Sequence, residues 1–294
     1  MPFPSVLLLG ATGRIGRVLQ QCWSASGVAD SILWQCRGPQ VNRRLNWVEI
    51  DPLCDVEALA RAGQGRAVIL CLAGVAPGRP GTFEDNITLA EAAIRAGAEI
   101  GARVLLASSA AVYGNQAGVL AETAPMRPIT AYGRAKAEME RRGRALGAEL
   151  GVPVCSLRIG NIAGLDAILG NWRPGFQLDQ FSDGRTPRRS YIGVQSLAQV
   201  LAEVAAASQL PVALNIAEPG VIEMGALLTA AGLNWTPQSA PESTIAEICL
   251  DLTALKAIGS LAVREGQADE LVAQWRKIAN MGLIQSQLHQ RCKG

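Results

Sequence analysis

The feature that most constrains the fold of this chain is a glycine-rich turn directly after its first apolar run. Residues 5–10 read SVLLLG, and residues 10–16 read GATGRIG. Residues 14–26 then place apolar side chains at helical spacing. The chain therefore opens with a strand, a tight glycine turn and a helix. In this context, backbone N–H groups at the helix N-terminus can bind a phosphate group.

Apolar runs and helical stretches alternate through the first two thirds of the chain. The continuous apolarity of the runs predicts strands that are buried on both faces, as in a parallel sheet covered by helices. We expect strands at 5–10, 31–36, 45–50, 67–74, 103–109, 152–159 and 212–217, and helices near 14–26, 55–62, 82–101, 131–150 and 196–208. This order predicts an α/β fold, a doubly wound parallel Rossmann sheet with a smaller, mainly helical C-terminal substrate lobe.

The regular alternation weakens after residue 160, where glycine, proline, arginine and aspartate become frequent. We therefore expect residues 1–160 to form the dinucleotide-binding domain, with 191–217 returning to it. Residues 161–190 and 218–294 are expected to form the substrate-binding lobe.

Composition excludes several classes of function. His289 is the only histidine, so a Ser-His-Asp triad and a histidine-rich metal site are ruled out, and no metal is expected. The net charge of +2 comes without a dense basic cluster, which argues against nucleic acid as a partner. The 7 cysteines include no CxxC pair, and no apolar run reaches membrane-spanning length. We expect a cytoplasmic protein that acts on a small molecule.

Three polar side chains in the middle of the chain could together bind and deprotonate a substrate hydroxyl. Tyr132 and Lys136 are four residues apart in a predicted helix, so their side chains share one face. Ser109 ends a predicted strand, where parallel sheets place ligands. A phenol with an unperturbed pKa of about 10 needs activation to act as a base. We expect Lys136 to lower the pKa of Tyr132 and Ser109 to bind the reacting oxygen; a plain surface pair is the alternative.

These motifs together resemble the extended short-chain dehydrogenase/reductases, in particular the NAD-dependent epimerase/dehydratase family. The GxxGxxG spacing, Ser109 and the Tyr132–Lys136 pair carry the resemblance. It implies that Ser109, Tyr132 and Lys136 are catalytic. The cofactor-binding residues that we expect are Gly10, Thr12, Gly13, Arg14, Ile15, Gly16, Arg37, Asp51, Leu72, Ala73, Gly74, Tyr132 and Lys136.

The end of the second predicted strand bears on the choice of cofactor. A carboxylate that selects NAD would lie there, but residues 34–37 read WQCR. Arg37 stands where a 2′-phosphate could be bound, with Arg43 and Arg44 close in sequence. We expect NADP(H) to be favoured and NAD(H) to remain an option. An ordinary surface arginine after a strand is the alternative interpretation.

The resemblance also implies that the substrate is a nucleotide sugar. Asn161 resembles a family asparagine that contacts the substrate diphosphate. Arg189 resembles a family arginine that binds a phosphate, a role that suits a fixed planar cation. With Ser109, these are the expected substrate-binding residues, and a solvated loop arginine is the alternative for Arg189.

Two departures from the family pattern bear on which reaction the chain catalyses and on how its two parts join. Family dehydratases and decarboxylases carry an acidic residue just after the catalytic serine or threonine, whereas this chain has Ala110 and Ala111. A later family motif usually continues with His and two Asp, where this chain has Gly193, Gln195 and Ser196. The first departure disfavours dehydration and decarboxylation. The second predicts an altered junction between domain and lobe.

Hypotheses from different classes stay open. The leading one is an NAD(P)-dependent epimerase-like enzyme that transfers a hydride reversibly at a sugar carbinol. The alternatives are an NADPH-dependent reductase of a small aldehyde or ketone and a non-catalytic NAD(P)-binding sensor or scaffold. Family dimers often pair through the helices expected here at 82–101 and 131–150, so monomer and homodimer both stay open.

Overall fold

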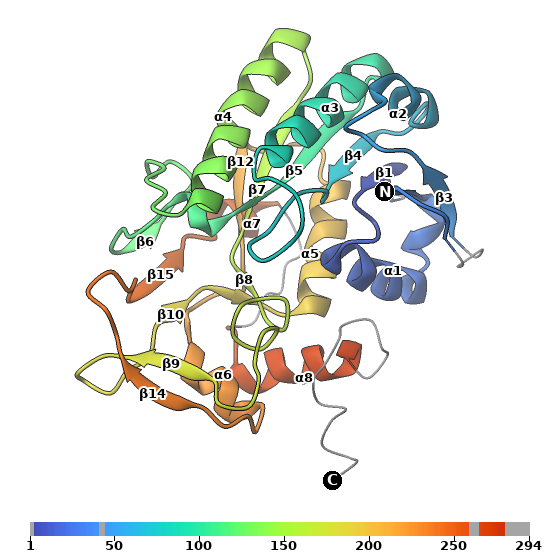
Figure 1. Cartoon of the computed structure of the whole chain (residues 1–294). Helices are drawn as coiled ribbons and strands as arrows, with labels where there is room; N and C mark the ends of the chain where they lie inside the picture. Colours follow the sequence, from blue (N-terminus) through green and yellow to red (C-terminus); the bar gives the residue numbers. More distant parts are fainter. Residues whose placement is uncertain (1–2, 41–44, 259–264, 280–294) are drawn as a thin grey trace.

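A parallel sheet forms the centre of the fold (Figure 1). The computed structural model describes residues 3–40, 45–258 and 265–279. The 7-stranded sheet has the order β12-β7-β5-β4-β1-β2-β3, and all neighbouring strands are parallel. Its strands are β1 (Val6–Leu9), β2 (Ile32–Cys36), β3 (Asn46–Glu49), β4 (Val68–Cys71), β5 (Arg103–Ser109), β7 (Val154–Ile159) and β12 (Ala213–Ile216). The strand order reverses beside β1, and open sheets of this kind bind ligands at that edge.

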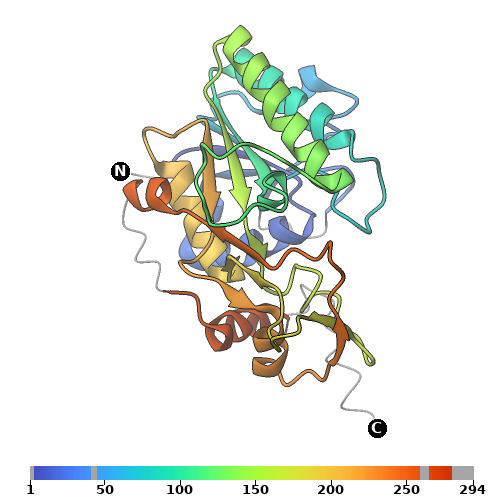
Figure 2. The same ribbon diagram turned by 90° about the vertical axis from the view of Figure 1, so that its left-hand side faces the viewer.

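Helices cover both faces of this sheet, as Figure 2 shows from the side. One face carries α1 (Arg14–Ser26) and α5 (Val194–Ala206), and the other carries α2 (Val56–Ala62), α3 (Asp85–Ile100) and α4 (Ala131–Leu150). Alternate residues of each strand supply the two cores: Leu8 packs with Leu19 of α1, whereas Leu7 packs with Leu59 of α2. The predicted doubly wound α/β fold is therefore confirmed.

Helix α4, which carries Tyr132 and Lys136, has clear signals at both ends. The Thr130 side chain accepts a hydrogen bond from the Gly133 N–H at 3.0 Å, which caps the first turn. Gly151 ends the helix in the left-handed conformation, with a φ of 69°. These signals fix where the helix begins, and so which of its residues face β5.

The C-terminal region is a mixture of strands and helices rather than mainly helical. It contributes a 4-stranded sheet in the order β13-β10-β15-β6 and the pairs β11-β8 and β14-β9. Its elements are β8 (Asn161–Ile162), β9 (Gln177–Gln180), β10 (Arg188–Arg189), β11 (Tyr191–Ile192), β13 (Ile222–Glu223), β14 (Thr236–Ser239), β15 (Glu247–Leu250), α6 (Met224–Ala230), α7 (Thr253–Ala257) and α8 (Ala268–Ala279). The fourth strand of its sheet, β6 (Val119–Leu120), comes from the segment between β5 and α4 and pairs with β15. The strands are short and β14 is exposed throughout, so they lack the apolar run that identifies a buried strand.

Helix α5 packs on the large sheet and β12 forms one of its edges, while the predicted division of the chain into domain and lobe stays a prediction. Short 3₁₀ turns η1 (Val28–Ser31) and η2 (Ala110–Val112) complete the elements. None of the described helices is both long and apolar enough to cross a membrane. Arg43, Arg44 and His289 lie outside the described residues.

Candidate active site

The glycine turn leaves no room for side chains beside the start of α1. Gly10 has a φ of +80°, and a Cβ there would lie 2.6 Å from the backbone nitrogen of Ala73. A Cβ on Gly16 would lie 2.3 Å from the Ala11 carbonyl oxygen. Gly13 precedes α1 without a side-chain cap, so it leaves the N–H groups of the first turn open to a ligand. This cradle fits the diphosphate of a dinucleotide cofactor.

Buried amide side chains hold the loops around the turn. Gln35 in β2 accepts a hydrogen bond from the Gly10 N–H at 2.9 Å. Asn86 in α3 accepts one from the Val75 N–H at 3.2 Å and donates to the Val75 carbonyl oxygen at 3.1 Å. A Cβ on Gly74 would clash with the Asn86 Oδ1. Both amides therefore fix backbone that borders the site.

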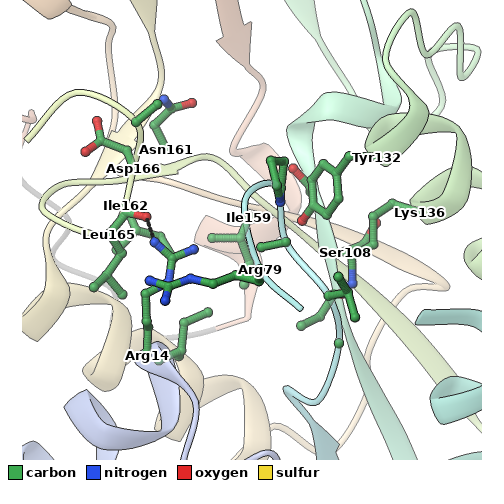
Figure 3. Close-up of a pocket in the computed structure, with 18 of the residues that line it drawn as sticks. Arg14, Arg79, Ser108, Tyr132, Lys136, Ile159, Asn161, Ile162, Leu165 and Asp166 are labelled. Carbon is green, nitrogen blue, oxygen red and sulfur yellow. Dashed lines mark hydrogen bonds between the residues drawn. The ribbon is translucent and has the colours of Figure 1, made fainter. Parts of the chain in front are cut away.

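Ser109, Tyr132 and Lys136 come together at the carboxyl end of β5, and Figure 3 shows the Tyr132 and Lys136 side chains side by side. Ser109 and Tyr132 share a hydrogen bond. The Lys136 Nζ lies 6.0 Å from the centroid of the Tyr132 ring and donates to the Ala107 carbonyl oxygen at 2.7 Å. The helical spacing thus places the tyrosine and the lysine on one face, as expected from the sequence.

Burial dominates the protonation of this group. Burial raises the pKa of Tyr132, whereas the Ser109 hydrogen bond and the positive charge of Arg14 lower it by less. Arg14 is thus a cation that lowers the pKa of the phenol, and the expected effect of Lys136 stays a prediction. Burial also lowers the pKa of Lys136 to about 8. At neutral pH, Tyr132 is a phenol and Lys136 is mostly an ammonium ion.

A cavity of about 640 Å³ opens between this group and α1. Several predicted site residues line it: Arg14, Ile15, Leu72, Gly74, Ser109, Tyr132, Lys136 and Asn161. The cavity wall does not include the other residues expected around the glycine turn, which are Gly10, Thr12, Gly13, Gly16 and Ala73. Of these, Gly10 and Ala73 are in close backbone contact with each other beside the cavity. The structure therefore joins the predicted catalytic group to part of the predicted cofactor site.

Two guanidinium groups, those of Arg14 and Arg79, line the cavity, and the second was not expected from the sequence. Arg14 donates to the Leu165 carbonyl oxygen at 2.5 Å, and Arg79 lies next to it (Figure 3). Burial lowers the pKa of Arg14, and the charge of Arg79 lowers it further. Two neighbouring guanidinium groups in one cavity favour an anionic ligand. Arg79 lies in a glycine- and proline-rich loop after β4, which gave no sign of this role.

Polar side chains form the wall opposite Tyr132, as Figure 3 shows for Asn161 and Asp166. The Tyr191 hydroxyl donates to the Asp166 Oδ2 at 2.9 Å and also shares a hydrogen bond with Asn161. Burial raises the pKa of Asp166, which the Tyr191 bond opposes. This wall fixes the predicted substrate-binding Asn161 against the C-terminal region.

Arg189 lies at a second, smaller cavity. This cavity, of about 170 Å³, is lined by Arg189, Ser109 and Asn161, and the last two also line the larger cavity. The Arg189 guanidinium donates to the carbonyl oxygens of Arg188 at 2.7 Å and Ile245 at 2.9 Å. A ligand that extends past Ser109 would therefore approach Arg189.

Arg37 and Asp51 lie outside both cavities, after β2 and β3. The Arg37 side chain is exposed, and the Asp51 carboxylate accepts a hydrogen bond from the Leu53 N–H at 3.1 Å. Because β2 and β3 follow β1 in the sheet, both residues lie along the edge that holds the glycine turn. This placement suits contacts to the adenosine end of a dinucleotide.

The sequence profile of the “NAD dependent epimerase/dehydratase family” matches residues 6–216. The chain belongs to this family. The resemblance that the glycine turn and the Ser109, Tyr132 and Lys136 motifs indicated is therefore confirmed. No curated protein matches the sequence.

Solved proteins of similar fold include a nucleotide-sugar dehydratase and a nucleotide-sugar 4-epimerase. MoeE5 in complex with UDP-glucuronic acid and NAD is 22% identical, with a TM-score of 0.75 over 93% of this chain and 99% of that chain. The dTDP-glucose 4,6-dehydratase DesIV of Streptomyces venezuelae is 20% identical, with a TM-score of 0.74 over 94% and 98%. The UDP-glucose 4-epimerase of Thermus thermophilus in complex with NAD is 20% identical, with a TM-score of 0.72 over 92% and 98%. At these identities the likeness shows the shared fold.

Gly193, where the sequence departs from the family motif, lies against the Gln274 side chain of α8. A Cβ on Gly193 would lie 2.2 Å from the Gln274 Oε1, so a larger residue would displace Gln274. That oxygen accepts hydrogen bonds from the N–H groups of Gln195 at 2.9 Å and Ser196 at 3.0 Å. Gln274 thus caps the N-terminus of α5, a contact between residues far apart in sequence.

We expect Gly193→Ala to push Gln274 out of this cap and to lower the free energy of unfolding by about 1 kcal/mol. In a chain of this size, such a loss lowers Tm by about 2–4 °C, which calorimetry can measure. Gln274→Ala should have a similar effect, and the double variant should add little because both changes remove the same cap. Gln199→Ala, at an exposed site of α5, is the control. Full additivity of the two changes would contradict this account.

Proposed function

We propose that this family member is a nicotinamide-dependent isomerase of the nucleotide-sugar epimerase type, which transfers a hydride reversibly at a sugar carbinol. The observation that carries the proposal is the Tyr132 phenol, hydrogen-bonded to Ser109 and followed one helical turn later by Lys136, on the wall of the large cavity. The glycine cradle adjoins the same cavity and fits the cofactor diphosphate.

The chain's own residues would handle the proton of the reaction. A bound nicotinamide dinucleotide supplies the hydride acceptor and donor, with Tyr132 and Lys136 placed to hold its nicotinamide ribose. Tyr132, a neutral phenol at pH 7, can donate its proton to a keto oxygen. In the reverse direction it takes the proton of the carbinol, and the positive charges of Arg14 and Lys136 favour the phenolate that this requires. Ser109 bonds the reacting oxygen and fixes its distance from Tyr132.

The charges around the cavities support a nucleotide sugar as the substrate. Asn161 lines both cavities, Arg189 lines the smaller one, and Arg14 and Arg79 line the larger one. A diphosphate would find a partner in each guanidinium group. The similar structures hold UDP-glucuronic acid in MoeE5 and UDP-N-acetylmuramic acid in the UDP-N-acetylglucosamine 4-epimerase of Methanobrevibacter ruminantium.

Epimerisation fits the residues beside Ser109 better than elimination does. Ala110 and Ala111 supply no acid there, and the Asp166 carboxylate on the far wall is engaged by Tyr191. Reduction of a small aldehyde or ketone by NADPH is the second candidate, and the exposed Arg37 after β2 favours it because NADPH commonly drives reductions.

Product analysis tests the two candidates. The full chain would be incubated with UDP- and dTDP-sugars and either cofactor, with nicotinamide absorbance and sugar NMR spectra recorded together. An epimer formed without net loss of cofactor supports the proposal. Stoichiometric consumption of NADPH with an aldehyde or ketone supports the second candidate. Formation of a dehydrated sugar would overturn both.

We also propose that the chain prefers NADPH, because β2 ends without a carboxylate and Arg37 follows it. We expect NADPH to bind about tenfold more tightly than NADH, and Arg37→Ala to remove that difference with little effect on NADH. Calorimetric titration measures both Kd values. Arg61→Ala, at an exposed arginine of α2, is the control. The similar structures hold NAD, so tighter binding of NADH would place this chain with them and reject the preference.

A further inference from the structure

Successive turns of α4 hold the end of β5 in place. Tyr132 shares a hydrogen bond with Ser109, and Lys136 donates at 2.7 Å to the carbonyl oxygen of the second residue before Ser109. Glu140, one turn further on, accepts a hydrogen bond from the Ser108 hydroxyl. The spacing of four residues places all three helix side chains on one face. Each of the three therefore contacts a different one of the last three residues of β5.

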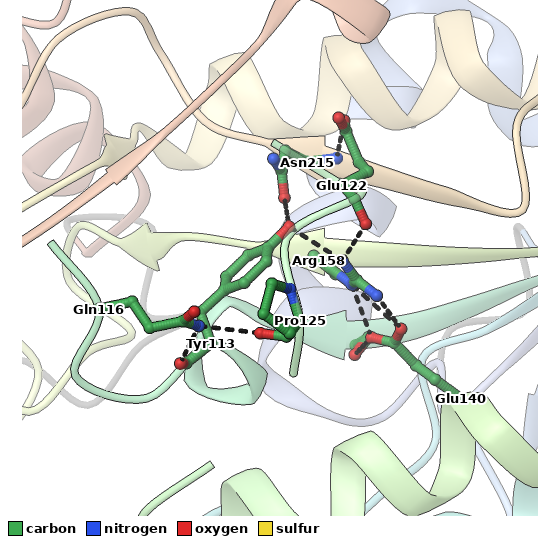
Figure 4. A network of polar contacts seen from close by, with 8 residues as sticks. Tyr113, Gln116, Glu122, Pro125, Glu140, Arg158 and Asn215 are labelled. Atoms are coloured by element: carbon green, nitrogen blue, oxygen red, sulfur yellow. Dashed lines mark hydrogen bonds and ion pairs between the residues drawn. The ribbon is translucent and has the colours of Figure 1, made fainter. Parts of the chain in front are cut away.

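Glu140 also belongs to a buried ion pair, which Figure 4 shows within a larger polar network. Arg158 Nη2 and Nε donate to the Glu140 Oε2 at 2.8 and 3.0 Å, and the two side chains are only 7% and 6% exposed. Ser108 and Arg158 are direct partners across β5 and β7, so Glu140 contacts both strands. Because a buried ion pair is often no more stabilising than apolar residues of similar size, stability alone does not account for it.

Within the part of the chain that the structure describes, Glu140 is the group that can supply negative charge to Lys136. The groups that act on the Lys136 ammonium are Cys71 from β4 and Glu140 from α4, with the Tyr132 ring beside it. Burial raises the pKa of the Cys71 thiol to about 11, so this thiol is neutral at pH 7. The Tyr132 phenol is neutral as well. The Glu140 carboxylate therefore opposes the burial that lowers the pKa of Lys136.

We propose that Glu140 is a positioning residue of the reaction centre: it links the helix that carries Tyr132 and Lys136 to the strand that carries Ser109, and it places a carboxylate one helical turn beyond Lys136. This inference rests on the proposed function, because it assigns Glu140 a task in the same hydride-transfer site. Ser108 and Arg158 are the partners through which the carboxylate is fixed.

Direct titration of Lys136 tests the charge without any turnover. The chain has only 4 lysines, so the side-chain NMR signals of the labelled chain can be resolved, and Lys136→Met identifies the signal of interest. We expect the wild-type midpoint near pH 8 and a midpoint lower by roughly one pH unit in Glu140→Gln. If Glu140→Gln does not fold, Glu140→Gln combined with Arg158→Met leaves no unpaired charge and serves in its place. An unchanged midpoint would overturn the assigned charge effect.

Kinetics test the hydrogen bond that links Glu140 to Ser108 of β5. With the substrate found by product analysis, Ser108→Ala should lower kcat several-fold with KM nearly unchanged, and Glu140→Gln should also move the alkaline limb of the kcat profile to lower pH. Glu140→Asp should restore the limb in part because it keeps the charge. Glu138→Gln, on the exposed side of α4, is the control and should match the wild type. Wild-type values of kcat in Ser108→Ala would reject a positioning role for the Ser108–Glu140 hydrogen bond. An absence of turnover in the wild type would reject the proposed function, while the NMR titration would still decide the charge effect.

Discussion

Replacing Tyr132 with Phe is expected to lower kcat by roughly 10²–10⁴-fold while leaving the Kd of the cofactor within about twofold. The hydroxyl is the proton donor in the proposed reaction and shares a hydrogen bond with Ser109. The aromatic ring should stay in place, because it packs edge-on against Phe83 with 5.8 Å between ring centroids. Steady-state kinetics and a binding titration measure the two effects separately.

The other tyrosines supply a matched control for this loss. Tyr113 is also buried, and its hydroxyl donates to Asn215 Oδ1 at 2.7 Å, away from the large cavity. Tyr113→Phe should lower stability, because Asn215 and Arg158 lose a partner, but kcat should fall far less than in Tyr132→Phe. Equal losses in the two variants would mean that disturbed packing, rather than a missing proton donor, causes the effect at Tyr132.

The meeting of Ser109, Tyr132 and Lys136 could be predicted because each step depends on local sequence. A strand end fixes Ser109, and the spacing of four fixes the other two on one helix face. The order of strands and helices then fixes which end of the sheet they share. The pKa of Tyr132 could not be predicted in this way. It depends on burial and on Arg14, whose guanidinium reaches the cavity only through the tertiary fold.

The contacts that could not be predicted from the sequence join segments that are far apart along the chain. Gln274 fills the space beside Gly193, and Glu140 meets Arg158 because β5 and β7 are neighbours in the sheet. Neither contact leaves a local pattern. The strands of the C-terminal region were missed for another reason: they are short, and exposed strands such as Thr236–Ser239 carry no alternation of apolar and polar residues.

Breaking the buried ion pair is the change with the largest expected effect on stability. Arg158→Met removes the positive charge and leaves the Glu140 carboxylate 6% exposed without its main partner. We expect the free energy of unfolding to fall by about 3–5 kcal/mol, and Tm to fall on the order of 10 °C. Chemical denaturation and calorimetry measure these quantities. Arg141→Met, which breaks the exposed pair with Glu138 on the same helix, should leave Tm within experimental error.

The double variant Arg158→Met with Glu140→Met separates charge from packing. It should recover most of the lost stability, because no buried charge is left without a partner. If it stays as unstable as Arg158→Met, the cost comes instead from packing around Tyr113, whose ring lies 5.0 Å from the Arg158 guanidinium. A double variant that regains stability but has a lowered kcat would show that the pair serves the reaction centre more than the fold. Stability alone would then favour apolar residues at these positions, and the charged pair would reflect what Lys136 and the end of β5 require.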